Sequence, residues 1–303
     1  MSTAPGALPH RGRAALFVVL AGAAFATSGP LARAGRPLHP FLIAFGRVAL
    51  AALVLVVADR RHLLASIRGL TRRQLATAGV AGLLLALHFD CFLWGLDHTS
   101  LPAAVSLVSL EPLGVVVSAW ALLGIAPTRP EWVGVGLATA GAVVVALGSG
   151  VGDHQLTGDL VVVAAVALYG LYLAAARALK DALPARSYVA LVYTSASFAL
   201  ALLLVAVPPA FAAPSWPPTT HSLLAVLALG VVPTLLGHSA VQTASRSLPP
   251  AVVALVSPGE TVGGIALGAI FLGAKPTSLE LLGALVILAG AAVAIAIKPP
   301  RTR

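Results

Sequence analysis

Six ionisable side chains interrupt long apolar runs in this sequence, and they are the residues best placed to do chemistry. They are Arg47, His88, Asp90, Glu111, His238 and Glu260. A charged group near the middle of a membrane helix costs about 2.5–3.5 kcal/mol on insertion scales, so it normally faces a water-filled cavity or a partner. A carboxylate in such a cavity can bind a proton or a cation. We therefore expect these side chains to mark a functional site.

Glu111 and Glu260 are the strongest candidates, because each lies roughly halfway along an apolar run. Pro112 follows Glu111, and a proline inside a helix removes a hydrogen bond and kinks the chain. Pro258 and Gly259 weaken the helix beside Glu260 in the same way, and freed backbone carbonyls can line an aqueous cavity. We expect two cavity carboxylates that bind a proton, a cation or a substrate. Protonated glutamates, hydrogen-bonded between packed helices, are the alternative.

His88 and His238 are the candidate proton carriers, because a histidine titrates near neutral pH. His238 shares a helical stripe with Gln242, four residues on, which suggests a polar surface facing the cavity. Both histidines could equally serve as neutral hydrogen-bonding struts between helices.

Asp90 and Trp94 lie four residues apart and therefore share one face of a helix. At 100° per residue, Asp90 points about 160° away from His88, so a regular helix cannot aim both at one cavity. If Asp90 does not face the cavity, we expect it to pair with Arg47 or a polar neighbour. Arg47 either locks a helix through a carboxylate or binds a substrate anion.

Tyr169 and Tyr172 are neighbours on one helical face within an apolar run. Aromatic walls suit amphipathic ligands. Packing between helices is the alternative role, so these two tyrosines are weaker candidates for substrate contact.

The composition requires a membrane. Of the 303 residues, 59% are hydrophobic and 10% are charged, and the mean hydropathy is +0.98. Soluble domains carry about 25% charged residues, so a soluble globular enzyme is excluded. The net charge of +9 is typical of cytoplasmic loops in a membrane protein rather than of nucleic-acid binding. The lone Cys91 excludes an intrachain disulfide.

Polar or proline-rich segments, such as the predicted loop from Asp59 to Arg73, divide the chain into ten spans long enough to cross a bilayer. We expect them at about 14–33, 39–58, 75–96, 101–123, 131–149, 158–177, 187–208, 222–244, 250–273 and 279–297. With a cytoplasmic N-terminus, fifteen of the 19 Lys and Arg residues fall on the inside and three on the outside. The positive-inside rule then predicts that both termini are cytoplasmic. A cleaved signal peptide, suggested by Arg11, Arg13 and Ala24-Phe25-Ala26, would leave nine spans.

An internal repeat divides the chain into halves of five spans, 1–150 and 151–303. The mates at an offset of 149 residues include Glu111 with Glu260, Gly134 with Gly283, and Gly141 with Gly290; His88 matches His238 at 150. An odd number of spans per half inverts the second copy, as in many secondary transporters with a central site. The recurring glycines predict close helix packing, either within the chain or in a homodimer.

These residues resemble those of a known family. Leu85-Ala86-Leu87-His88-Phe89 with Trp94, Leu236-Gly237-His238, and Gly259-Glu260-Thr261-Val262-Gly263 are similar to segments of EamA-domain transporters of the drug/metabolite transporter superfamily. The sequence departs from the family pattern at Ile125 and Ala274, where a glutamate is expected, and at Thr261, where a proline is expected. The resemblance implies a ten-helix exporter of amino acids, metabolites or drugs with a central cavity between its halves.

We therefore expect an all-α integral membrane protein that works as a secondary transporter. It would export small metabolites, amino acids or drugs by alternating access, with protons as the counter-ion. An importer of the same fold and an intramembrane enzyme using His88 and Asp90 are the alternatives. We expect no cofactor, because the sequence lacks a phosphate-binding Walker motif, a metal cluster and a serine nucleophile elbow. The abundance of alanine, and of arginine over lysine, suggests a bacterial inner membrane.

Overall fold

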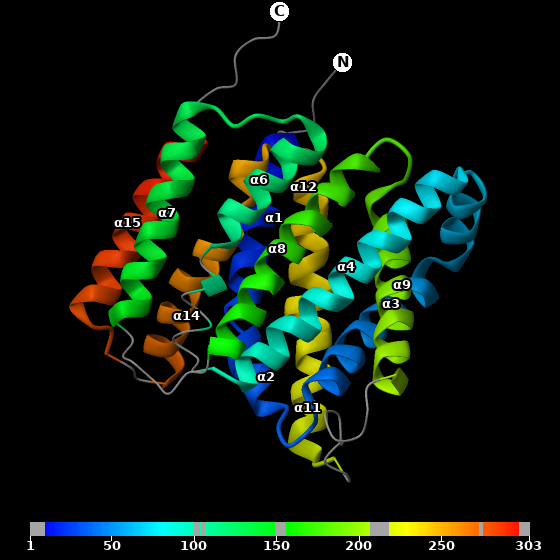
Figure 1. Cartoon of the computed structure of the whole chain (residues 1–303), viewed down its shortest axis with the longest axis horizontal. Coiled ribbons are helices and arrows are strands. Elements are labelled where there is room, and N and C mark those ends of the chain that lie inside the picture. The colour runs from blue at the N-terminus through cyan, green and yellow to red at the C-terminus, as the bar shows by residue number, and fades with distance from the viewer. Residues whose placement is uncertain are drawn as a thin grey trace, which may run out of the picture.

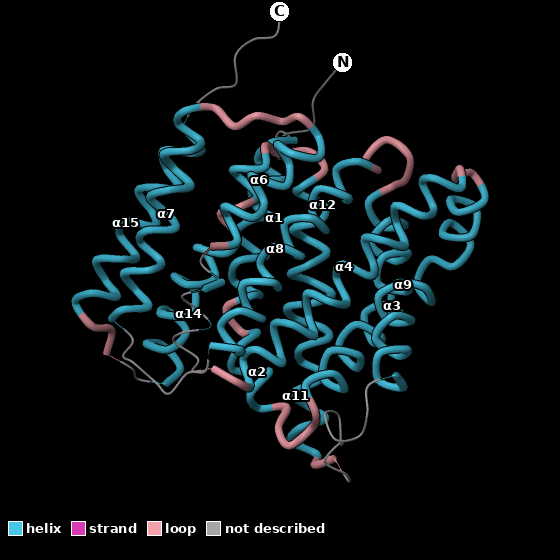
Figure 2. The backbone as a smooth tube through the Cα atoms, viewed as in Figure 1, coloured by secondary structure: helices cyan, strands magenta, loops and turns pink. Residues whose placement is uncertain are grey.

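The computed structural model describes residues 10–99, 104, 107–108, 110–148, 156–206, 218–272 and 275–296. Within these residues every regular element is a helix (Figures 1 and 2). In chain order they are α1 (His10–Phe25), α2 (Ser28–Ala34), α3 (Pro40–Arg68), α4 (Arg72–Asp97), α6 (Glu111–Leu123), α7 (Arg129–Gly148), α8 (Leu156–Ala178), α9 (Ala185–Ala206), α11 (Thr220–Leu229), the π-helix η1 (Gly230–His238), α12 (Ser239–Ser245), α13 (Pro250–Val253), α14 (Val256–Leu272) and α15 (Ser278–Ala296). The fold is therefore all-α over the described chain.

Seven stretches of the described chain are long and apolar enough to cross a membrane. They are Leu16–Ala34, Pro40–Arg68, Arg72–Asp97, Leu156–Ala178, Ala185–Ala206, Thr220–Ser245 and Pro250–Leu267. Apolar helices of fewer than 18 residues are Glu111–Leu123 and Ser278–Ala294. Large apolar side chains also face outward, including Phe198 at 74% exposure and Val205 at 84%. Such a surface is stable only against lipid, so the chain is a multi-pass membrane protein.

Helix boundaries follow local sequence signals. Thr128 and Glu131 cap the start of α7, and the equivalent Thr277 and Glu280 cap α15, so both repeats use the same capping box. The predicted loop from Asp59 to Arg73 is wrong in part. Helix α3 continues to Arg68 past a non-helical residue at Asp59 (φ −148°, ψ 34°).

The helices that carry the two glutamates differ from the expected kinked spans. Helix α6 begins at Glu111, so Pro112 stands in its first turn, where the missing N–H breaks no hydrogen bond. In the second repeat the chain turns at residues 254–255, and α14 begins before Pro258. The breaks therefore precede both prolines. The predicted tight junction at 99–102 extends outside the described residues.

The two repeats interlock rather than forming separate lobes. Helix α8 of the second repeat packs on α4 and α6, and α1 of the first repeat packs on η1, α12 and α14 in the equivalent way. Helices α3 and α9, which are repeat mates, pack against each other, and so do α7 and α15. In Figure 1 the α7–α15 pair forms one flank of the bundle.

Glycines allow α7 and α15 to approach closely. A Cβ atom added to Gly141 would lie 2.7 Å from the backbone oxygen of Gly283, and one added to Gly290 would lie 2.7 Å from that of Gly134. The predicted close packing of these glycines is thus found within the chain, where small residues let helix backbones touch.

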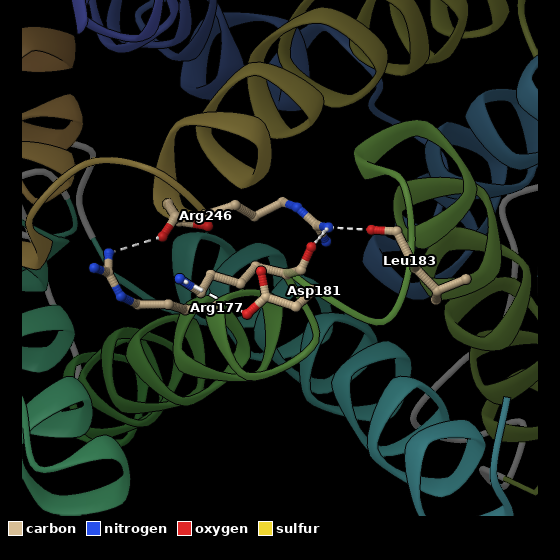
Figure 3. Close-up of polar contacts among 6 residues, drawn as sticks. Arg177, Asp181, Leu183 and Arg246 are labelled. Carbon is tan, nitrogen blue, oxygen red and sulfur yellow. Dashed lines mark hydrogen bonds and ion pairs between the residues drawn. The ribbon is translucent and has the colours of Figure 1, made fainter. Parts of the chain in front are cut away.

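Two arginines tie the end of α8 to the end of α12 (Figure 3). Arg177 donates to the carbonyl oxygens of Ser245 and Leu248. Arg246 donates in return to the carbonyl oxygens of Lys180 and Leu183 in the α8–α9 turn. Because carbonyls at helix C-termini lack intrahelical donors, these bonds satisfy groups that would otherwise need water. We call this reciprocal contact the arginine clasp.

Candidate functional site

A small cavity lies where the two repeats meet, and side chains from both line it. They are Phe25, Ser28, Arg47, His88, Phe89, Phe92, Val108, Glu111, Tyr169, His238 and Glu260. The cavity has a volume of about 30 Å³, which is room for about two water molecules. The cavity is therefore small for a substrate site.

Arg47 is the most deeply held charge in the cavity. It is 1% exposed, and its Nε donates to Thr234 Oγ1 at 2.7 Å. Its guanidinium carbon lies 4.2 Å from the centroid of the Phe89 ring. Neither Nη1 nor Nη2 has a hydrogen-bond partner among the described residues. The predicted pairing of Arg47 with Asp90 is absent from these contacts.

The π-helix η1 explains why Thr234 can hold Arg47. Pro233 has no N–H, so it cannot donate to the carbonyl of Leu229. The Thr234 hydroxyl donates to that carbonyl instead, at 2.8 Å, and keeps a lone pair for Arg47. The backbone carbonyl of Thr234, in the same turn, accepts the Tyr193 hydroxyl at 2.8 Å. The helical irregularity thus positions the guanidinium.

His88 and His238 lie side by side, with ring centroids 6.0 Å apart. His88 Nδ1 is 2.9 Å from the Ala165 carbonyl of α8, which makes His88 a tie between helices. His238 Nδ1 has no partner in the described chain, and its ring packs against Phe25 at 4.5 Å. These two repeat mates therefore line the same cavity but differ in their hydrogen bonds.

Glu111 and Glu260 enter the cavity from α6 and α14. Glu111 is 5% exposed and lies beside Ser257, whose hydroxyl donates to the Val108 carbonyl at 3.0 Å. Glu260 shares the cavity with Arg47 and lies near enough to interact with it electrostatically. Gly259, beside it, faces Gly22 of α1, so this glycine serves the contact between α14 and α1.

Asp90, Trp94 and Gln242 do not line the cavity. Asp90 is 5% exposed, and neither carboxylate oxygen finds a hydrogen-bond partner among residues that the structure describes. Trp94 stacks on His98 at 3.7 Å between ring centroids. Gln242 is fully buried beside Tyr193. The sequence argument that His88 and Asp90 point in different directions agrees with this arrangement.

Tyr172 stands behind the cavity wall. Its ring lies 5.9 Å from Tyr169 and 6.2 Å from His238. Sequence reasoning did not select the apolar wall residues Phe25, Phe89 and Phe92, or the anchor Thr234. A proline directly before a threonine in an apolar run was the only available signal for that anchor.

A family model of EamA-like transporters matches the chain twice, at residues 12–147 and 156–296. The chain belongs to the EamA-like transporter family. This EamA-like protein is therefore a membrane protein of the drug/metabolite transporter type, built from two EamA repeats. Its small-molecule substrate and its lipid surroundings follow from that assignment, which indicates a transporter rather than an enzyme.

Comparison with curated proteins gives no match to this EamA-like chain. A solved structure titled "Crystal structure of protein" is 21% identical, with a TM-score of 0.74, and the match covers 93% of this chain and 97% of that one. At this identity the likeness establishes the fold alone. Among the described residues, no group of three or more His, Cys, Asp and Glu side chains could hold a metal ion.

Proposed function

We propose that this EamA-like protein is a secondary exporter that moves small metabolites, amino acids or drugs by alternating access around the central cavity. Glu111, Glu260 and the histidines are its proton-binding groups. The observation that carries the proposal is the pairing of repeat mates in one cavity. Glu111 and His88 come from one repeat, and Glu260 and His238 come from the other. A site shared by both repeats changes shape whenever the repeats rock against each other.

The small size of the cavity is consistent with the same proposal. About 30 Å³ is far less than the several hundred Å³ that enclose a small-molecule ligand. The site of a transporter that alternates access changes in size during the cycle, and a cavity with room only for water is consistent with one state of that cycle. Substrate binding would then require the cavity to widen.

The topology we propose is ten spans in two inverted repeats, 1–150 and 151–303, with both termini on the cytoplasmic side of a bacterial inner membrane. The arrangement in Figure 1 supports it, because the α3–α4, α6–α7 and α8–α9 turns lie toward one end of the bundle and the α14–α15 turn lies toward the other. The first group carries Arg72, Arg129 and Lys180, as the positive-inside rule requires. A homodimer remains a prediction.

Cys91 is the single cysteine, so a Cys91→Ser background permits topology mapping. A cysteine placed at Arg72 should react with an impermeant thiol reagent only in inside-out vesicles. One placed at Lys275 should react only in right-side-out vesicles. Labelling of both from the same side would refute the inverted arrangement.

Transport is tested in proteoliposomes by counterflow of a panel of radiolabelled amino acids and organic acids, with a pH gradient of either sign. We expect an inward proton gradient to drive substrate outward. The double variant Glu111→Gln/Glu260→Gln should lose this coupling between proton entry and substrate export. The matched control is Glu131→Gln/Glu280→Gln, a second pair of repeat mates that lies outside the cavity. Glutamine preserves their capping boxes.

Coupling that survives in the cavity double variant would remove the glutamates from the mechanism. Uptake driven by an inside-negative potential without a pH gradient would favour the importer. Chemical conversion of a substrate would favour the intramembrane enzyme.

A further inference from the structure

We propose that Arg47 is the substrate-recognition residue of the cavity and that it binds the carboxylate of a small organic anion with an apolar or aromatic body. The inference rests on the proposed transport function and deepens it by naming the substrate class. Three observations carry it: the free edge of the guanidinium, its fixed orientation and the aromatic walls around it.

The free edge is the first observation. Nε of Arg47 is occupied by Thr234, while Nη1 and Nη2 have no hydrogen-bond partner in the part of the chain that the structure describes. Arginine does not lose its charge in proteins, and an unpaired buried charge is strongly unfavourable. Two parallel N–H donors on one planar fork match the two oxygens of a carboxylate. An anion therefore satisfies what the protein leaves open.

Fixed orientation is the second observation. The guanidinium is held at one edge by Thr234 and on one face by Phe89, 4.2 Å away. A side chain fixed in this way loses little further freedom when a ligand binds, so less binding energy is spent on ordering it. A salt-bridged structural arginine would instead be bonded to a carboxylate. Glu260 shares the cavity and acts on Arg47 electrostatically, but among the described acids none forms a hydrogen bond with Nη1 or Nη2.

The walls of the cavity are the third observation. Phe25, Phe89, Phe92 and Tyr169 line it together with Arg47. Aromatic and apolar walls with a few polar groups are the usual composition of a small-molecule pocket. A ligand with a carboxylate at one end and an apolar group at the other fits both parts of this lining.

The test is equilibrium binding of radiolabelled 3-phenylpropionate to the full chain in lipid nanodiscs. Its neutral isostere 3-phenylpropionamide and the cation phenethylamine serve as competitors. We expect saturable binding of the acid, and displacement by the amide or the amine at least roughly tenfold weaker than by the unlabelled acid, because a charge-assisted bidentate contact is lost. Absence of saturable binding, or equal displacement by all three compounds, would overturn the proposal.

Variants test the residue itself. Arg47→Lys keeps the charge but loses the fork, so binding should weaken roughly 10- to 100-fold. Arg68→Gln, an exposed position on the same helix, is the matched control and should bind as the parent does. If Arg47→Lys fails to fold, Thr234→Val removes the anchor while preserving the side-chain volume. Thr234→Val should weaken binding roughly three- to tenfold. Thr234→Ser, which keeps the hydroxyl, should bind as the parent does.

Equal binding by Arg47→Lys and Arg68→Gln, or by Thr234→Val and Thr234→Ser, would refute the role of the guanidinium. Because binding is measured without flux, this result and the transport result can fail separately. Tight binding of the acid with no counterflow would defeat only the transporter mechanism. Flux of a substrate that shows no preference for a carboxylate would defeat only this inference.

Discussion

The α7–α15 interface and the central cavity are both built from repeat mates, yet they differ in how far the mates remain equivalent. At the interface, Gly141 meets Gly283 while Gly134 meets Gly290, so each repeat supplies the same surface to the other. In the cavity, Nδ1 of His88 is bonded to a backbone carbonyl, whereas Nδ1 of His238 has no partner among the described residues. The first region is symmetric in both sequence and contacts. The second is symmetric only in position.

The difference separates packing from chemistry. Two helices that must touch need the same small residues on both sides, so duplication alone suffices. A ligand has different ends, so a site that binds it in one orientation must present different groups on its two sides. Arg47 and its anchor Thr234 supply that polarity here. Substitutions of mates should therefore have equal effects at the interface and unequal effects in the cavity.

The largest effect is expected at the interface. Gly141→Ala and Gly290→Ala each place a Cβ within 2.7 Å of backbone atoms across the helix pair. Overpacking of this kind costs about 1–3 kcal/mol, and the two variants should be destabilised by similar amounts. Thermal unfolding in detergent measures the loss. Gly136→Ala, on the same helix with open space around it, is the control and should unfold at or above the parent temperature, because alanine favours a helix.

A stable Gly141→Ala protein would mean that the helices do not touch as closely as described. Unequal losses at Gly141 and Gly290 would mean that the interface is not symmetric. Either result would weaken the contrast with the cavity.

The second effect concerns the glutamate mates. Glu260 acts on Arg47, whereas Glu111 lies beside Ser257. Glu260→Gln removes an acid that acts electrostatically on the guanidinium without bonding to it, so 3-phenylpropionate should bind roughly three- to tenfold more tightly. Glu111→Gln should change this affinity less than about twofold. Nanodisc binding provides both values, and equal shifts would show that the two acids are interchangeable.

The third effect concerns the histidine mates. Asparagine can place a donor near the position of Nδ1, whereas leucine cannot, so His88→Leu should be less stable than His88→Asn by about 1 kcal/mol. His238 Nδ1 has no partner among the described residues, so at that position leucine should be at least as stable as asparagine. Thermal unfolding of the four variants measures the contrast. The same order of stability at both positions would contradict the asymmetry.

Much of this arrangement could be predicted from sequence, because a charge in an apolar run has few stable places. Arg47, Glu111, Glu260 and the two histidines were candidates on that ground, and the structure brings them to one cavity. The interlocking of the repeats could not be predicted, since an internal repeat defines mates but not which helices touch.

Other features carry too little local signal. Asp90 and Glu111 look alike in sequence, as buried acids in apolar runs, and only the packing of α4 and α6 decides which one meets the cavity. Phe89 looks like an ordinary core residue in the sequence. A phenylalanine that packs against a leucine cannot be distinguished there from one that packs against a guanidinium. The expected kink at Pro112 is a helix start at Glu111 instead, since a proline suits both a kink and the first turn of a helix.

The last comparison concerns the two ends of the bundle. Arg246 lies at the position equivalent to Asp97, at the offset of 149 residues. Arg246 binds two backbone carbonyls in the arginine clasp, whereas Asp97 forms an ion pair with the 52%-exposed Arg36. Exposed ion pairs contribute about 0–1 kcal/mol, and hydrogen bonds from a charged donor contribute about 1.5–3 kcal/mol. Removing the arginine clasp should therefore open that end of the bundle more than removing the ion pair opens the other end.

Labelling of a cysteine at Ser28, which lines the cavity, measures this difference in the Cys91→Ser background. Arg246→Gln should raise the rate of modification by an impermeant thiol reagent roughly tenfold or more from the side of the clasp. Asp97→Asn should raise it less than about fivefold, from the opposite side, because the ion pair is worth at most about 1 kcal/mol. A larger effect of Asp97→Asn would place the stronger closure at the ion pair, and the asymmetry between the two ends would then run in the opposite direction.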